Sequence, residues 1–235
     1  MRRLADYLSF LIVYHIFLYI SSSSLIKSCN KYLPFLLNLN NTPEDKKMTD
    51  FSEIRNACMQ CTNCPLHETR TNVVFGVGNP DAKILFVGEA PGENEDLQGE
   101  PFVGRGGQLL DLYLNGVGLD RKSNIYITNI LRCRPPHNRD PRPEEQQACL
   151  PFLRQMVKQM QPKVIVCVGR IAAQVIISKD FKVSKEHGVF YERGGMLLMG
   201  TFHPAALLRD PRRKGDCFED FLKLQDKIKA LGIEI

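Results

Sequence analysis

The stretch AKILFVGEAPGENEDLQGEPFVGRGGQLLDLYL, residues 82–114, begins with an apolar run and ends with an amphipathic one. A short apolar run, a turn and a helically periodic segment are typical of a buried strand that leads into a helix. Between them, residues 88–107 carry five acidic residues and six glycines but no lysine. A phosphate-binding P-loop ends in Gly-Lys-Ser or Gly-Lys-Thr, so this turn must serve another purpose.

The alternation of strand and helix continues along the chain. Apolar runs bounded by turn residues predict strands, and 3.6-residue periodicity with start and stop signals predicts helices. Strands that alternate with helices indicate an α/β sandwich with a largely parallel sheet. The predicted strands are 83–90, 124–131, 163–169 and a pair within 189–204 around Gly-Gly, and the predicted helices are 51–61, 106–118, 143–161, 170–178 and 216–232.

Three polar segments follow predicted strands. These are the turn at 88–92, the pair Thr128-Asn129, and the pair His203-Pro204. In open α/β sheets, ligands bind beyond the carboxyl ends of the strands. We therefore expect these three segments to meet at one edge of the sheet.

The first 47 residues differ from the rest in composition. A basic start, an apolar segment at 8–20 and four serines resemble a signal peptide, yet the apolar segment is shorter than the roughly 20 residues that cross a bilayer. Met48 begins a segment typical of a soluble protein. We expect residues 1–47 to be an upstream extension, residues 48–235 to form one domain without a stable membrane partner, and the protein to be cytoplasmic and monomeric.

The net charge gives only weak support for a nucleic-acid partner. It is +5 for the chain, and residues 1–47, with six basic and three acidic residues, account for +3 of it. Local clusters make a stronger case, because the loops 131–142 and 207–215 each hold four basic residues. A charged loop by itself is also compatible with simple solvent exposure.

Five of the eight cysteines form a pattern. Cys58, Cys61 and Cys64 follow a CxxCxxC spacing, and Cys133 and Cys149 flank the basic, proline-rich loop. A CxxC turn directs two sulfurs at one point, so the spacing favours four thiolates on a metal centre over cysteines scattered in a core. Four sulfur ligands suit zinc or an iron–sulfur centre alike, and the spacing leaves both open.

Four motifs together carry a resemblance: GEAPGENED, GEPFVGRGG, YITNILRCRPPHNRDP and TFHPAALLR. In their order and spacing, the chain from about Cys61 to its end resembles the family 4 uracil-DNA glycosylases, the iron–sulfur type of bacteria and archaea. The resemblance implies a three-layer αβα sandwich around a central four-stranded parallel sheet. It also implies hydrolysis of the N-glycosidic bond between uracil and deoxyribose in DNA, the first step of base excision repair.

The resemblance also implies the identity of the metal centre. In that family, a CxxC pair and two later cysteines hold a [4Fe–4S] cluster. Carried over, the ligands are Cys61, Cys64, Cys133 and Cys149, and Cys58 becomes a bystander. The expected role of the cluster is structural, because it would tie the cysteine-rich turn to the basic loop.

The family resemblance assigns roles around a base that is flipped out of the DNA stack. Gly88 lets the backbone approach the nucleotide, and Phe102 stacks on the uracil ring. Asn129 donates to uracil O4 and accepts from N3–H, a pattern that cytosine reverses. His203 donates to uracil O2 as the leaving group becomes anionic. Without the resemblance, each of these residues would also fit an ordinary structural role.

The carboxylates of the acidic turn are assigned as follows. We expect Glu89 to orient water or the sugar, and Glu95 to lie beside C5 of the base, where it would exclude the methyl group of thymine. Ala90 stands where the family 1 enzymes carry an aspartate. Asp96 remains a further candidate. The alternative is that these acids cap the helix expected near Gly106.

Contacts with DNA are expected from the two basic loops. Leu207 or Leu208 would fill the space left by the flipped base, a device of proteins that distort nucleic acids. Arg134, Arg139 and Arg209 would bind phosphates.

Two other functions use some of the same residues. An iron–sulfur electron carrier would need the cysteines but neither Asn129 nor His203. A non-catalytic DNA-binding module would need the basic loops but not the acidic turn.

Overall fold

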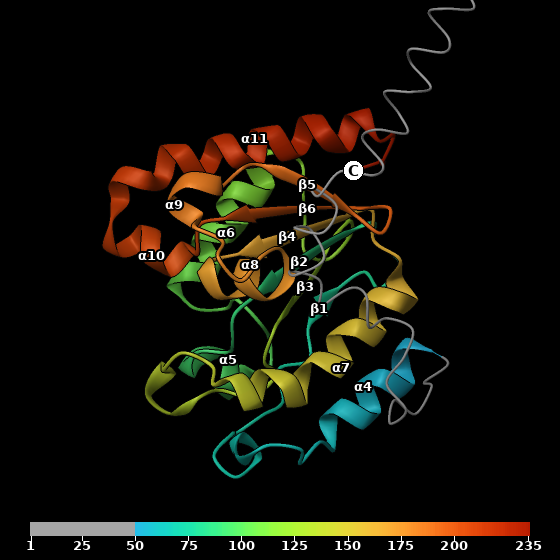
Figure 1. The fold of residues 1–235 in the computed structure, drawn as a ribbon, viewed down its shortest axis with the longest axis vertical. Coiled ribbons are helices and arrows are strands. Elements are labelled where there is room, and N and C mark those ends of the chain that lie inside the picture. The colour runs from blue at the N-terminus through green and yellow to red at the C-terminus, as the bar shows by residue number, and fades with distance from the viewer. Residues whose placement is uncertain (1–49) are drawn as a thin grey trace, which may run out of the picture.

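A computed structural model describes residues 50–235, and the expected extension at 1–47 lies outside the described residues. The chain forms a six-stranded sheet between two layers of helices (Figure 1). The expectation of an α/β sandwich with four parallel strands is confirmed, and an antiparallel strand is added at each edge. In spatial order the strands are β1 (Val77–Gly78), β3 (Tyr126–Asn129), β2 (Ile84–Gly88), β4 (Val164–Val168), β6 (Met196–Thr201) and β5 (Phe190–Arg193).

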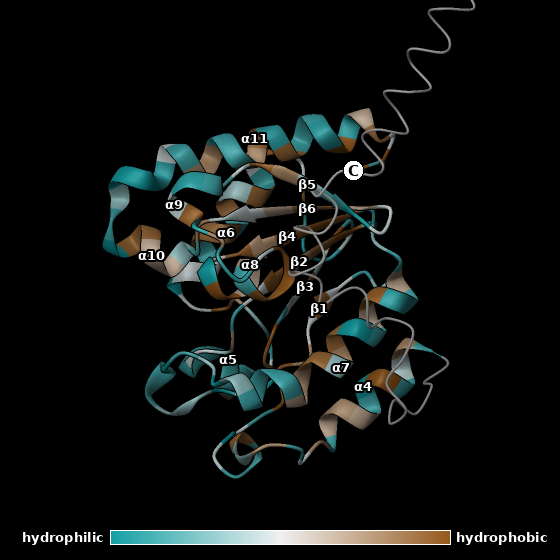
Figure 2. Ribbon diagram, in the orientation of Figure 1, coloured by the Kyte–Doolittle hydropathy of each residue, from teal (hydrophilic) through white to brown (hydrophobic). Residues whose placement is uncertain are grey.

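The central strands are apolar on both faces. In β2, Ile84 and Phe86 join one core cluster, whereas Leu85 and Val87 join the other. Successive side chains of a strand point to opposite faces, so a continuous apolar run must be covered on both sides. Figure 2 shows this pattern as apolar strands in the middle and polar outer helix surfaces.

The helices form the two outer layers (Figure 1). Their buried residues fall into the same two clusters as the strand residues, which assigns each helix to a face. One face carries α4 (Phe51–Met59), α7 (Pro143–Met160) and α8 (Arg170–Ile176), and the other carries α6 (Arg105–Gly116), α10 (Pro204–Arg209) and α11 (Lys214–Ala230).

The remaining elements are short. None of the described helices is long and apolar enough to cross a membrane. The predicted hairpin in 189–204 is confirmed, and its two glycines, Gly194 and Gly195, both have positive φ angles. The short elements are α5 (Glu93–Gln98), α9 (Val183–Glu186) and the 3-10 helices η2 (Pro65–His67), η3 (Pro136–Asn138) and η4 (Pro211–Arg213).

Packing of α11 on the sheet makes a testable contribution to stability. Phe221 is 1% exposed and stacks on Phe86 of β2 with ring centroids 6.1 Å apart. We expect Phe221→Ala to lower the free energy of unfolding by about 3–5 kcal/mol, because it leaves a cavity in the core. Urea denaturation measures this loss. Phe218, on the same helix but 37% exposed, is the matched control, and an equal loss in Phe218→Ala would contradict this packing.

Candidate active site and cysteine cavity

A cleft of about 510 Å³ opens at the carboxyl ends of the parallel strands. Its lining includes Glu89 after β2, Asn129 at the end of β3 and His203 after β6. The expectation that the three polar segments meet at one edge of the sheet is thus confirmed. Gly88, the first residue of the turn, is not part of the cleft lining but packs beside Asn129 and Phe102, which are.

The ends of β2 and β3 approach each other very closely. Gly88 lies beside Asn129 in the parallel register, and its carbonyl accepts a hydrogen bond of 2.8 Å from the Ile130 N–H. A Cβ atom at position 88 would lie 2.3 Å from Oδ1 of Asn129 and 2.6 Å from Cζ of Phe102. Only glycine fits there, because the backbone lies close to Asn129 and Phe102 within the protein; the expected approach of Gly88 to the nucleotide stays a prediction.

Asn129 presents its carboxamide to the cleft. The residue is 2% exposed, and none of the other described residues hydrogen-bonds the carboxamide. The donors and the acceptor of the carboxamide are open to the cleft. The carboxamide is therefore placed to bind a ligand with a matching donor and acceptor.

Phe102 forms part of the cleft wall in an unusual backbone conformation. Its φ angle is 56°, which few residues other than glycine adopt, and such strain is often found at functional sites. Arg121 holds the turn by donating to the carbonyl oxygens of Pro101 and Phe102, at 3.1 and 3.0 Å. The Phe102 ring stacks on the imidazole of His203 with centroids 5.7 Å apart.

His203 caps the N-terminus of α10. Its Nδ1 accepts a hydrogen bond of 3.2 Å from the Ala205 N–H, so the proton of the neutral ring belongs on Nε2. Burial lowers the pKa of His203 to about 4, and the positive charge of Arg209 acts in the same direction. At neutral pH the imidazole is uncharged and is a hydrogen-bond donor through Nε2.

The pKa of Glu89 is shifted upward, in the direction opposite to that of His203. Burial raises the pKa of Glu89 to about 7, and the negative charge of Asp140 adds to this effect, whereas Arg170 opposes it. Arg170 and Asp140 form an ion pair of 2.6 Å at the rim of the same cleft. Sequence reasoning missed this pair, because nothing in the residue spacing predicts that it faces Glu89.

Glu95 lines the cleft, but its carboxylate is occupied by the main chain. Oε1 accepts from the N–H groups of Val103 and Gly104, both at 2.9 Å, and Oε2 accepts from Gly92 at 3.1 Å. The alternative expected these acids to cap the helix near Gly106, which is α6, whereas Glu95 belongs to the cap of α5; its contact with C5 of a base stays a prediction. The carboxylate caps α5 and joins it to the turn before α6.

Asp96 also has a structural position. It is 3% exposed, and its carboxylate accepts hydrogen bonds from the backbone N–H groups of Thr71 and Asn72 at 3.0 and 3.2 Å. It is therefore removed from the candidates for catalysis. Ala90, in contrast, does line the cleft next to Glu89.

The two leucines of α10, Leu207 and Leu208, differ in their exposure to solvent. Leu207 is 1% exposed and packs in the core between the sheet and the α6–α11 layer, so it is not placed to enter DNA. The assignment of Leu207 as a wedge is wrong for this conformation, because helical periodicity turns it inward. Leu208 is only partly buried and remains the candidate.

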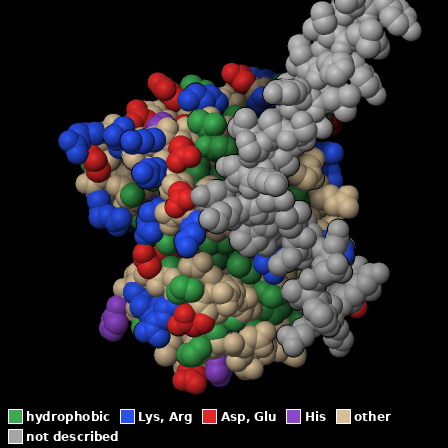
Figure 3. Space-filling model, viewed as in Figure 1, with side chains coloured by type: hydrophobic (Ala, Val, Ile, Leu, Met, Phe, Trp, Pro, Cys, Tyr) green, Lys and Arg blue, Asp and Glu red, His purple; other side chains and the backbone are tan. Residues whose placement is uncertain are grey.

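The three arginines expected to bind phosphates differ in whether other residues of the protein already engage their side chains. Arg139 forms a two-point ion pair with the buried Glu145, at 2.9 and 2.5 Å. Arg134 donates to Oδ1 of Asn138 at 2.8 Å, and Arg209 is exposed at the rim of the cleft. In Figure 3, Lys and Arg side chains gather at the end of the molecule that carries α10 and the start of α11.

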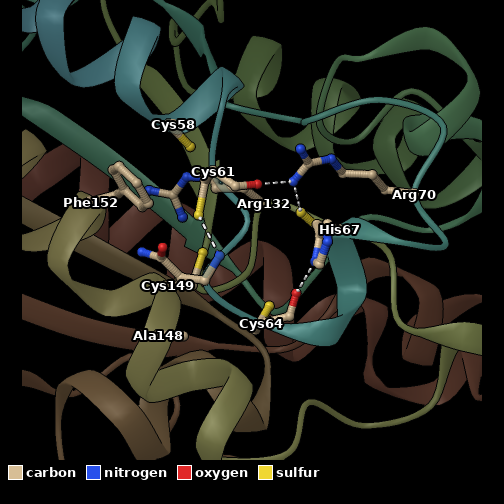
Figure 4. Close-up of a pocket in the computed structure, with 11 residues that line it drawn as sticks. Cys58, Cys61, Cys64, His67, Arg70, Arg132, Ala148, Cys149 and Phe152 are labelled. Carbon is tan, nitrogen blue, oxygen red and sulfur yellow. Dashed lines mark hydrogen bonds between the residues drawn. The ribbon is translucent and has the colours of Figure 1, made fainter.

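Five cysteines line a second cavity, which lies beside α4 and α7 (Figure 4). Two N–H groups approach their sulfurs: Nη1 of Arg70 lies 3.3 Å from Sγ of Cys133, and the Asn63 N–H lies 3.5 Å from Sγ of Cys61. Residues 50–235 contain no group of three or more His, Cys, Asp or Glu side chains placed to hold a single metal ion. The cysteines of the cavity are Cys58, Cys61, Cys64, Cys133 and Cys149.

Two arginines of this cavity were not identified as such from the sequence. Arg132 was counted with the basic loop, but it is 1% exposed and lines the cavity. Arg70 also donates to the carbonyl oxygen of Cys61 at 2.8 Å. The only sequence signal that could have placed either arginine at the cavity is its position close to a cysteine along the chain.

Comparison with known proteins agrees with this geometry. Residues 75–224 match the model of the family described as the uracil DNA glycosylase superfamily. The chain belongs to this superfamily.

Several members of the uracil DNA glycosylase superfamily are similar over most of the chain. The type-4 uracil-DNA glycosylase of Archaeoglobus fulgidus is 45% identical over 185 residues, which are 75% of this chain and 92% of that protein. The type-4 enzyme of Thermotoga maritima is 45% identical over 177 residues, 74% of this chain and 92% of that protein. The type-5 uracil-DNA glycosylase of Thermus thermophilus is 33% identical over 150 residues, 55% of this chain and 68% of that protein.

The shifted pKa of Glu89 is open to direct measurement. We expect its carboxyl group, followed by carbon NMR, to titrate near pH 7. Asp140→Asn should lower this midpoint because it removes a negative charge, and Arg170→Gln should raise it because it removes a positive one. A wild-type midpoint near the ordinary value of about 4.3 would contradict the burial of Glu89.

Proposed function

We propose that this chain is a uracil-DNA glycosylase, which hydrolyses the bond between uracil and deoxyribose in DNA and leaves an abasic site as the first step of base excision repair. One observation carries the proposal: the carboxamide of Asn129 and the imidazole of His203 line the same cleft, next to the ring of Phe102. The names of the type-4 relatives support it.

Asn129 recognises the base. Uracil offers an N3–H donor next to the O4 acceptor, which matches the acceptor and donor of one carboxamide. Cytosine has an acceptor at N3 and a donor at N4, so both contacts would be lost and buried polar groups would stay unpaired. Gly88 packs closely beside the Asn129 carboxamide and the Phe102 ring, which leaves the carboxamide little room to turn. Phe102 supplies the ring on which the flipped base stacks.

His203 stabilises the leaving group. When the bond between C1′ and N1 breaks, its electron pair moves onto uracil, and O2 gains negative charge. The neutral imidazole donates from Nε2 to O2, and a donor placed in advance in a site that excludes water can lower the barrier by about 3–4 kcal/mol. The uracil anion then takes a proton from solvent.

Glu89 acts on the other side of the bond. The sugar becomes positively charged as uracil departs, and the carboxylate of Glu89 stabilises that charge. Water then forms a bond to C1′ and gives up a proton to Glu89. A base with a pKa near the working pH is suited to this proton transfer.

The DNA strand is held by basic residues of the two loops, the half-buried Arg134 and the exposed Arg209. We assign phosphate contacts to Arg134 and Arg209, and the wedge in the vacated stack to Leu208. Arg139 supports the loop through its ion pair with Glu145. Phosphate contacts of this kind weaken as salt rises, because they release counterions from the DNA.

We further propose that the cysteine cavity holds a [4Fe–4S] cluster through Cys61, Cys64, Cys133 and Cys149. The residues present fit this group: the cavity has a sulfur-rich lining from separate segments, N–H groups directed at two sulfurs, and no carboxylate among its described lining. When bound, the cluster would cross-link the cysteine-rich turn to the loop after β3. The described cysteines form no disulfides, which fits a cytoplasmic protein.

The assay that tests the proposal is uracil release from DNA. We expect Asn129→Ala and His203→Ala each to lower kcat by about 100- to 1,000-fold, since each removes a contact to the reacting base. Circular dichroism should show the fold unchanged. Asn115, exposed on the outer surface of α6, is the matched control for the asparagine change. Wild-type kcat in both variants would remove the assignment.

The pH profile separates the two acid–base residues. Glu89 must be ionised, so we expect kcat/KM to rise with pH through a midpoint of about 7, as the raised pKa of Glu89 requires. The imidazole of His203, with a pKa of about 4, stays neutral across this range and adds no step. Glu89→Gln should lower the rate and abolish the midpoint. A midpoint that persists in this variant would assign it to another group.

The cofactor has its own test. We expect the purified protein to be brown and to contain iron and inorganic sulfide in equal amounts. Cys133→Ser should lose both, whereas Cys167→Ser, a buried cysteine in β4, should retain them. A colourless wild-type protein that contains zinc would contradict the cluster.

A further inference from the structure

Arg132 is a buried cation without a carboxylate. Its side chain is among the largest that are fully buried, and it forms no ion pair with any described acidic residue. Removal of a guanidinium from water is costly unless an anion or hydrogen bonds replace the water. The surroundings of Arg132 must therefore supply a compensating group.

The Arg132 guanidinium finds hydrogen-bond partners for Nη1 and Nη2 but not for Nε. Nη1 donates to the backbone carbonyl oxygen of Asn129 and lies 3.3 Å from that of Ile130, and Nη2 lies 3.0 Å from Sδ of Met156. Nε is buried and has no partner. One part of the guanidinium thus holds the end of β3, and another part is unsatisfied.

The same side chain lines the cysteine cavity. Arg132 lines this cavity together with Cys58 and Cys149, as Figure 4 shows. The described lining contains five cysteines but no aspartate or glutamate. Metal-bound thiolates and sulfides are therefore the anions that this position offers to the guanidinium.

We propose that Arg132 is a positioning residue that links the occupancy of the cysteine cavity to the orientation of Asn129. The inference rests on the proposed function, since it takes Asn129 as the base-reading residue and a sulfur-bound cluster as the occupant. Cluster-bound thiolates of the cavity would place negative charge beside the guanidinium of Arg132 and would hold it in place. The guanidinium in turn fixes the Asn129 carbonyl, and with it the strand end that carries the carboxamide.

Amide hydrogen exchange at the end of β3 tests this link without relying on activity. The Ile130 and Leu131 N–H groups bond to the carbonyls of Gly88 and Glu89, at 2.8 and 3.0 Å, and report on that strand end. We expect removal of the cluster from the wild-type full chain to speed their exchange by about tenfold, as local opening becomes easier. In Arg132→Gln the exchange should already be fast with the cluster bound.

Kinetics supply a second readout. Loss of a residue that supports a site from behind it typically costs about 10- to 100-fold in activity, and we expect this loss in kcat of Arg132→Gln, with KM changed less than about threefold. The residues assigned to DNA contact are untouched, which is why KM is spared. Arg55→Gln, an exposed arginine on α4, is the matched control and should behave as wild type.

A conservative variant separates charge from geometry. Arg132→Lys keeps the positive charge beside the cysteines but cannot donate in two directions from a planar fork. We expect it to retain iron as wild type does and still to show fast exchange at Ile130. It also serves as the test protein if Arg132→Gln does not fold.

The outcomes are distinguishable. Unchanged exchange at Ile130 and Leu131 after cluster removal, or wild-type exchange and kcat in both Arg132 variants, would overturn the link. Absence of uracil release by the wild-type protein would instead refute the proposed function, and a wild-type protein without iron would refute the cofactor.

Discussion

The contact between the ends of β2 and β3 is the constraint on which the rest of the site depends. Gly88 and Asn129 are partners in the parallel register, and the space between them admits no Cβ atom at position 88. This contact fixes the Asn129 carboxamide and leaves room for Phe102 to close the wall of the cleft. The sheet itself, with apolar residues on both faces of every central strand, keeps the two strand ends from moving apart.

Burial acts in opposite directions on the pKa values of Glu89 and His203, which line the same cleft. It lowers the pKa of His203 and raises that of Glu89, because low polarity disfavours the charged form of each. The consequence is that one cleft holds a neutral imidazole and a carboxyl group that ionises near neutral pH. In the proposed function, the imidazole acts on the base and the carboxylate acts on the sugar.

The sequence allowed the fold and the meeting of three loops to be predicted, because apolar runs mark buried strands and parallel strands bring their carboxyl ends together. The edge strand β1 was missed, since two residues carry no periodicity. The main-chain hydrogen bonds of Glu95 and the burial of Leu207 and Arg132 were also missed. Glu and Arg are usually exposed, and Leu207 and Leu208 are neighbours on one short helix, so only tertiary packing determines which of these side chains turns inward.

The central claim is that one pyrimidine touches Asn129 and His203 at the same time. Nitrogen NMR of the full chain, titrated with free uracil, tests it most directly. The account predicts that the Asn129 carboxamide and the Nε2–H of His203 shift together with a single dissociation constant, and that cytosine shifts neither at the same concentrations. A uracil titration that moves one of the two signals and leaves the other unchanged would contradict the account.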